Sequence, residues 1–176
     1  MHRLEEAFEL RNKKQNKIEQ IKELKTPLSV YQKLDEICAA GLDDLNDEDS
    51  SYFLKCFGAF LKKDGKFMLR VRIPAGQLSI EQAAKIGEVS QKYGEDYIDI
   101  TTRQQIELRY IKLKDLAIVL KELESIGVST FQTGVDNFRN IVTSAFEGLG
   151  SKNIVHVKPL IDQLQSIFMH KEEWIG

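Results

Sequence analysis

The chain has 176 residues, a formal net charge of −2 and 42% hydrophobic residues, which is typical of one ordinary domain or a small domain with appendages. A charge this close to neutral provides no bulk attraction to nucleic acid or to a membrane surface. No apolar run approaches the length of a membrane span, and residues 1–14 lack the apolar segment of a secretory signal, so we expect a cytoplasmic protein without membrane contact.

The cysteines and histidines do not form a metal-binding pattern. Cys38 and Cys56 are far apart in the sequence and flanked by apolar residues, which predicts buried free thiols instead of a disulfide or a metal site. The three histidines have no ligand spacing.

Residues 1–50 are expected to form a helical arm. Apolar residues recur at helical spacing within residues 1–25, Pro27 ends this segment, and residues 28–46 predict another helix that stops at Gly41. Packing on the parent domain is the simplest use of the apolar stripe. The acidic stretch LDDLNDEDSS has no EF-hand spacing and is interpreted as a solvated loop.

The segment that follows predicts a strand with two different faces. YFLKCFGAF leads into a tight turn at Asp64-Gly65, so a hairpin with FMLRVRIP is expected. Within FMLRVRIP, apolar residues alternate with Met68, Arg70 and Arg72, which is the period of a strand with one apolar face.

Residues 79–131 continue with a helix, two strands, a helix and a final strand. Ser79 and Gln82 form a capping box for a helix that ends at Gly94 and buries Ile80, Ile86 and Val89. Strands are predicted at 97–101 and 105–111, a helix capped by Asp115 follows, and 128–131 begins the last strand. The fold class is therefore α+β, a ferredoxin-like β-α-β-β-α-β half-domain whose two helices cover the apolar face and leave the arginine face open. After a loop and a flexible connector, residues 159–169 predict a C-terminal helix.

Arginine is concentrated in this half-domain and in the loop after it. Five of the seven arginines lie between Phe67 and Val142, namely Arg70, Arg72, Arg103, Arg109 and Arg139. Arginine provides a planar fork for carboxylate or phosphate oxygens. A solvated face with arginines paired to Asp99 and Glu107 explains the same spacing equally well.

Three motifs in register, FMLRVRIPAG, ITTRQ and DNFRNIV, resemble the siroheme-containing nitrite and sulfite reductases over about residues 52–168. The resemblance implies that Arg72 and Arg103 contact the siroheme or its carboxylates. It also implies that Arg139 lies with Arg72 on the distal side, where the substrate anion, nitrite or sulfite, binds and the two arginines serve catalysis. Thr102, Gln104 and Asn140 are expected in the same pocket.

The chain also departs from the family pattern. The family usually has Gln and His where this chain has Glu107 and Arg109, so the usual role is not transferred to these two residues. The family's 4Fe-4S cysteines and its basic strand come after a segment like this one, and Cys38 and Cys56 match no cluster motif. We therefore expect residues 1–50 to be the arm, 51–133 the half-domain and 134–176 the truncated start of the siroheme and iron-sulfur domain. The resemblance further implies ferredoxin as the electron donor, and the segment alone is expected to be inactive without the remainder of its chain.

Two other functions fit the element order. An RNA-recognition sheet would carry aromatic residues on its open face, but here Tyr97 is the one clear aromatic residue expected there, which argues against nucleic acid. A stand-alone scaffold or regulatory module could pair with a partner through the open sheet.

Overall fold

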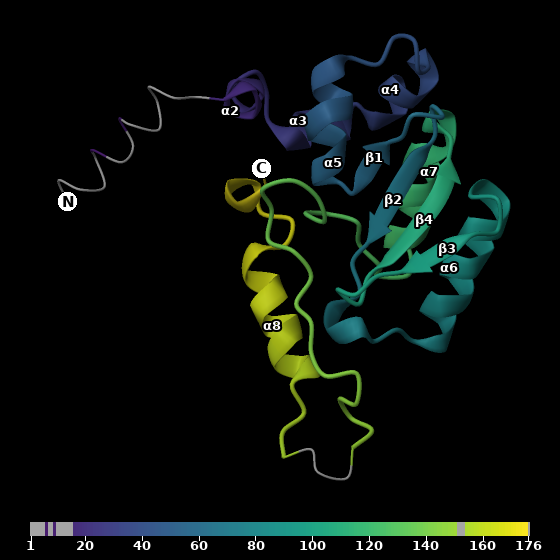
Figure 1. The fold of residues 1–176 in the computed structure, drawn as a ribbon, viewed down its shortest axis with the longest axis vertical. Helices are drawn as coiled ribbons and strands as arrows, with labels where there is room; N and C mark the ends of the chain where they lie inside the picture. Colours follow the sequence, from purple (N-terminus) through teal and green to yellow (C-terminus); the bar gives the residue numbers. More distant parts are fainter. Residues whose placement is uncertain (1–5, 7–8, 10–15, 151–153, 176) are drawn as a thin grey trace.

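The computed structural model describes residues 6, 9, 16–150 and 154–175. The first part of the expected N-terminal helix, including Leu4, Ala7 and Phe8, lies outside the described residues. Figure 1 shows a sheet with helices packed against it and a long loop leading to a separate C-terminal helix. Within the described residues, no helix is long and apolar enough to cross a membrane.

The N-terminal arm consists of short helices. Asn16 caps α2 (Lys17–Lys22) by accepting from two backbone N–H groups, and Thr26 caps α3 (Pro27–Gln32). The single helix predicted for residues 28–46 is instead α3 followed by α4 (Leu34–Ala40), which ends at Gly41 as expected. A π-helical turn over Asp49–Phe53 and the short α5 (Leu54–Cys56) lead to the sheet.

The sheet has four antiparallel strands in the order β1-β2-β4-β3. Its strands are β1 (Ala59–Leu61), β2 (Phe67–Val71), β3 (Ile98–Ile100) and β4 (Ile106–Ile111). The hairpin predicted at Asp64-Gly65 joins β1 to β2. A 3₁₀ turn over Pro74–Gly76 ends the β2 segment.

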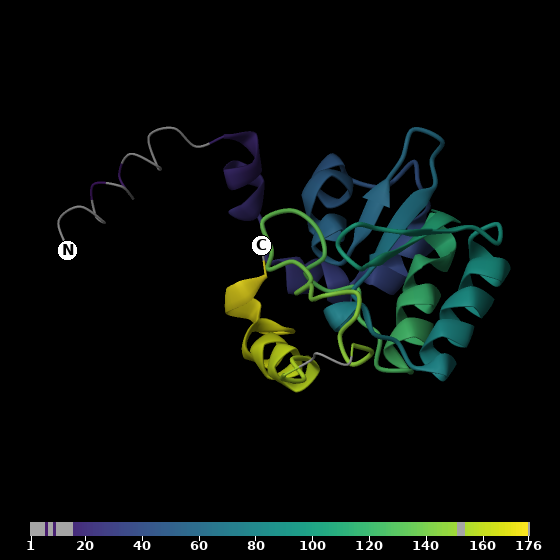
Figure 2. The ribbon, with the colours of Figure 1, turned by 60° about the horizontal axis from the view of Figure 1, so that its bottom comes forward.

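Two helices cover the apolar face of the sheet, and in Figure 2 they lie side by side. The capping box of Ser79 and Gln82 is present at the start of α6 (Ile80–Tyr93). In contrast, α7 (Leu113–Glu124) begins after Lys112, so the prediction that Asp115 caps this helix was wrong. The prediction of an α+β ferredoxin-like half-domain is confirmed.

The final strand of the predicted order is shortened to one backbone bridge, between Arg72 and Ser129. The reason is that β1 pairs with most of the outer side of β2 and leaves only the end of this strand free. Ile80 at the start of α6 was expected to be buried but is 85% exposed. Ile100 is 80% exposed, because β3 is an edge strand of the sheet.

The core lies between the sheet, α6, α7 and the aromatic segment before β1. Its largest fully buried side chains include Tyr52, Phe53, Phe57 and Phe67. Cys38 and Cys56 are both buried and free, as predicted, and burial raises the pKa of the Cys56 thiol to about 11.

The loop after α7 leads to α8 (Lys158–Phe168), which lies apart from α6 and α7 and contacts the 3₁₀ turn over Pro74–Gly76, and then to a 3₁₀ turn over Glu172–Trp174 (Figure 2). Ile161 and Phe168 of α8 are buried, whereas Leu160 and Ile167 are exposed. The C-terminal helix is therefore present at the predicted position, but only part of its apolar surface is covered.

Candidate functional site

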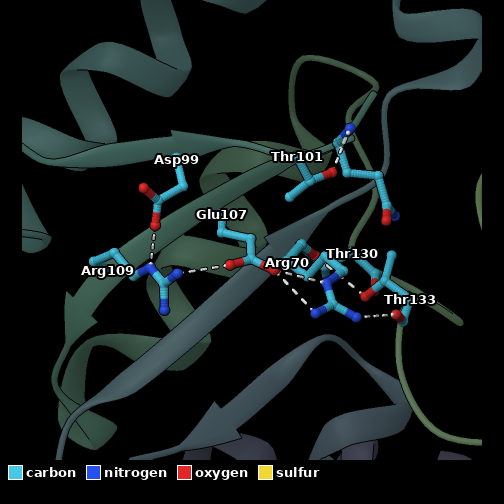
Figure 3. A network of polar contacts seen from close by, with 8 residues as sticks. Arg70, Asp99, Thr101, Glu107, Arg109, Thr130 and Thr133 are labelled. Carbon is cyan, nitrogen blue, oxygen red and sulfur yellow. Dashed lines mark hydrogen bonds and ion pairs between the residues drawn. The ribbon is translucent and has the colours of Figure 1, made fainter. Parts of the chain in front are cut away.

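The arginines on the polar face of the sheet do not form a uniform open surface. Arg70 pairs with Glu107 at 2.9 Å, and Arg109 pairs with both Glu107 at 2.9 Å and Asp99 at 2.6 Å. Figure 3 shows the resulting ladder, which crosses the sheet from Asp99 to the backbone of Thr133. The alternative in which arginines of this face pair with Asp99 and Glu107 is therefore confirmed. Arg70 pairs with Glu107, and Arg109 pairs with both carboxylates.

Arg72 lies at the end of β2 and is almost completely buried, with an exposed fraction of 2%. All three guanidinium nitrogens donate hydrogen bonds. Their acceptors are the backbone oxygens of Phe131, Gln132, Phe138 and Arg139 and Oε1 of Gln165. Burial lowers the pKa of Arg72 to about 10, which leaves it charged at neutral pH.

The expectation that the arginine face stays open is wrong for Arg72. The loop after Ser129 folds over the end of β2, and α8 packs behind it, so the guanidinium faces carbonyl oxygens instead of solvent. Met68 on the same face is also buried. An anion could reach Arg72 only by replacing some of these acceptors.

Two other predicted residues, Asn140 and Gln104, also form hydrogen bonds with backbone groups. The Asn140 amide donates to the backbone oxygens of Ile73, Arg103 and Gln104. The Gln104 side chain donates to the oxygen of Thr143 and accepts from its N–H, at 2.8 and 3.0 Å. The two side chains thus join the 101–105 turn to the loop that contains Arg139.

Arg103 and Arg139 are brought together and stay accessible. Both are exposed, and both line a cavity of about 170 Å³ whose other walls are Arg70, Thr101, Thr102, Gln105 and Glu107. Among the described residues neither Arg103 nor Arg139 forms an ion pair with a carboxylate. Burial, together with the positive charges of Arg103 and Arg70, lowers the pKa of Arg139.

Gln105 is a site residue that the motif comparison did not single out. It is 2% exposed, and its Nε2 donor is buried without a hydrogen-bond partner in the described part of the chain. The sequence contained a signal, because residues 105, 107 and 109 alternate onto the polar face of β4. An unpaired buried donor beside two arginines favours a ligand that presents oxygen acceptors.

A second, more apolar cavity of about 630 Å³ adjoins the first, and the two share Thr101 and Gln105 as lining residues. Ile73, Ile100 and Leu149 contribute to its wall. Cationic and apolar surfaces therefore meet at the end of the sheet where β2 and the 101–105 turn lie close together. This combination suits a ligand with an apolar body and acidic groups at its edge.

The fold and this end of the sheet define a ferredoxin-like half-domain with an arginine-lined cavity. Residues 60–126 match the family described as the nitrite/sulfite reductase ferredoxin-like half domain. This ferredoxin-like portion of the chain therefore belongs to the nitrite/sulfite reductase family, and the relatives support the same assignment.

The relatives are reductases of greater length. The ferredoxin–nitrite reductase of Leptolyngbya laminosa is 34% identical over 161 residues, which are 90% of this chain and 32% of the relative. The chloroplastic ferredoxin–nitrite reductase of Arabidopsis thaliana is 32% identical, with 85% of this chain and 27% of the relative covered. This chain thus spans about a third of the length of these relatives.

A solved structure supports the fold. The NirA protein of Mycobacterium tuberculosis superposes with a TM-score of 0.83 over 90% of this chain and 33% of that chain. Because the identity is 20%, this similarity concerns the fold alone.

Proposed function

We propose that this chain provides the anion-binding edge of a siroheme-dependent nitrite reductase. In this proposal, Arg103 and Arg139 hold the oxygens of the siroheme carboxylates or of the substrate anion. The observation that carries the proposal is a pair of accessible arginines beside the buried amide donor of Gln105, all three without carboxylate or hydrogen-bond acceptor side chains as partners among the residues that the structure describes. The names of the relatives favour nitrite over sulfite as the substrate and ferredoxin as the electron donor.

The residues present fit a siroheme. Its acidic side chains match the cationic cavity, and its macrocycle matches the adjoining apolar wall. When bound, the iron macrocycle supplies the electron chemistry of the six-electron reduction. The contribution of this chain is to bind the cofactor's acidic edge and to stabilise negative charge on anionic oxygen with Arg139.

The same proposal includes direct contact of Arg72 with the substrate or the siroheme. It also includes the expected pocket positions of Thr102, Gln104 and Asn140. Thr102 is exposed and lines the cationic cavity. For Arg72, contact would require an exchange of its carbonyl acceptors for the ligand.

The residues described here do not fit a 4Fe-4S cluster. Such a cluster requires four thiolates, and Cys38 and Cys56 are buried free thiols. Within the described part of the chain, no group of three or more His, Cys, Asp and Glu side chains is arranged to hold a metal ion. We propose that the cluster ligands and the full reaction belong to a larger reductase.

The proposal is tested by titrating the 176-residue chain with siroheme and following its absorption. We expect Arg103→Met and Arg139→Met each to weaken binding by about tenfold, the equivalent of one lost charge-assisted contact of about 1.4 kcal/mol. Lys114→Met is the matched control, because Lys114 is an exposed cation on α7 outside the cavity. Absence of siroheme binding, or an equal effect of all three substitutions, would contradict the proposal.

A further inference from the structure

The loop that contains Arg139 is tied to the sheet by side chains at two places. At the first, the Arg72 guanidinium donates to the carbonyl oxygen of Arg139 itself, at 2.9 Å, and to three other backbone oxygens of the loop. The chain then returns towards the sheet, where Ala75 N–H donates to the oxygen of Ile141. The backbone of Arg139 is therefore held from one side by a buried residue.

The second tie connects Arg139 to the other cation of the site. Asn140, the next residue after Arg139, donates from Nδ2 to the carbonyl oxygen of Arg103 at 3.0 Å and to that of Ile73 at 2.8 Å. It is 9% exposed. The orientation of the amide is determined by its neighbours, because a flipped Asn140 would place its oxygen against these carbonyl oxygens.

Like charges make this tie functionally relevant. Arg103 and Arg139 line the same cavity. The carboxylate in its wall, that of Glu107, is paired with Arg70 and Arg109, so the guanidinium groups of Arg103 and Arg139 repel each other. The Arg139 guanidinium also donates to the carbonyl oxygen of Val135 at 3.2 Å, so this bond and the backbone attachments together limit how far the two accessible side chains move apart. The amide of Asn140 joins these two attachments directly.

We propose that Asn140 is a positioning residue that sets the separation of Arg103 and Arg139 and thereby selects the size of the anion they hold. The inference rests on the proposed function, in that it takes the two arginines as an anion site. Two guanidinium groups at a fixed separation favour an anion whose oxygens match that separation. Two guanidinium groups that move independently bind anions of the same charge with similar affinity, whatever their size.

The test compares nitrite with nitrate, which have the same charge and different sizes. Binding of each anion to the 176-residue chain is followed by NMR through the side-chain Nε–H signals of Arg103 and Arg139. Asn140→Ala removes the tie, and Asn140→Ser keeps one donor as a milder change. Gln132→Ala is the matched control, because this buried amide also donates to two backbone oxygens, those of Phe168 and Trp174, outside the anion site.

We expect Asn140→Ala to change the ratio of nitrate to nitrite affinity by about threefold or more, with Asn140→Ser intermediate and Gln132→Ala at the wild-type ratio. A purely structural loss would weaken the binding of both anions by the same factor. The ratio of their affinities would then stay unchanged, which would overturn the inference. Amide hydrogen exchange across residues 138–143 is measured in the same samples and should accelerate in Asn140→Ala only.

The two proposals can fail separately. If the wild-type arginine signals do not respond to nitrite, the anion site is refuted. The tie is then judged by hydrogen exchange, and unchanged exchange in Asn140→Ala refutes it as well. If wild-type binds nitrite but Asn140→Ala retains the wild-type ratio, only the positioning role is refuted.

Discussion

Replacement of Arg72 by methionine is predicted to be the most destabilising single change in the loop region. The guanidinium provides the hydrogen bonds of four backbone oxygens and of Gln165, and its partners are 59 to 93 residues away in sequence. Methionine fills part of the volume but donates nothing, so these buried acceptors lose their charged donor.

The magnitude follows from two opposing terms. A hydrogen bond to a charged group contributes about 1.5–3 kcal/mol, and five are lost. Against this, burial lowers the pKa of Arg72 to about 10, a desolvation cost of about 3 kcal/mol that the substitution removes. With the five bonds taken at the lower limit, about 7.5 kcal/mol in total, we expect a net loss of about 4 kcal/mol, within the range of about 3–5 kcal/mol for disruption of a buried charged network.

The measurement is urea unfolding followed by circular dichroism, with Trp174 fluorescence as a local probe. Trp174 is the one tryptophan of the chain. Its ring centroid lies 5.3 Å from that of Phe138, so its emission reports whether the loop and the C-terminal turn remain together. Arg72→Lys keeps the charge with fewer donors and should lose about 2–3 kcal/mol.

Arg70→Met is the control on the same strand. Arg70 is partly exposed, and its partner Glu107 retains Arg109 after the substitution, so the loss should be about 1 kcal/mol. A loss below about 1 kcal/mol for Arg72→Met, or one equal to that of Arg70→Met, would refute the view that Arg72 organises the loop.

Two further predictions concern the helices and the hairpin entry. The pKa of Glu122 is lowered to about 2, with the hydrogen bond from Lys85 as the largest cause, so its ion pair stabilises the fold above the ordinary carboxyl pKa and is lost as the pH falls through about 2. Glu122→Gln should therefore reduce the unfolding free energy at pH 7 by about 1 kcal/mol, a value discounted for solvent screening, and urea titrations should show the difference vanishing towards pH 2. Gly58 has φ +80°, and an added Cβ would lie 2.5 Å from Oγ1 of Thr133. Gly58→Ala should cost about 3 kcal/mol in the same assay, whereas Gly65→Ala, with φ +74° and only a side-chain methyl nearby, should cost about 1 kcal/mol; equal losses would contradict this reasoning.

Local patterns predicted the elements of this fold well. The alternation in FMLRVRIP and in the 105–111 segment predicted β2 and β4, and the Ser79–Gln82 capping box predicted the start of α6. These features depend on residues a few positions apart. The final strand was not predicted correctly, because competition from β1 for the edge of β2 is a long-range event that residues 128–131 do not encode.

The motifs assigned three arginines to one site, which stays a prediction, and they did not distinguish the surroundings of these arginines. The motifs identified Arg72, Arg103 and Arg139 together, but the three differ in burial. Arg72 is buried and donates hydrogen bonds to backbone oxygens, whereas Arg103 and Arg139 line a cavity. That difference arises only when the loop after Ser129 and α8 pack over the end of β2. Gln105 could have been recognised from its alternation with Glu107, but its unpaired donor is visible only in three dimensions.

The distribution of partners among the arginines explains why one end of the sheet carries an arginine-lined cavity in a chain whose net charge is −2. Carboxylates neutralise Arg70 and Arg109 in the ladder across the strands. Carbonyl oxygens and one amide oxygen surround Arg72, which makes its charge a structural one. Arg103 and Arg139 remain exposed without a carboxylate partner among the described residues, and the Arg139 guanidinium donates to the carbonyl oxygen of Val135. Arginine charge without a paired carboxylate therefore gathers at this cavity in the described part of the chain, and this is the surface that we propose for a ligand with acidic groups.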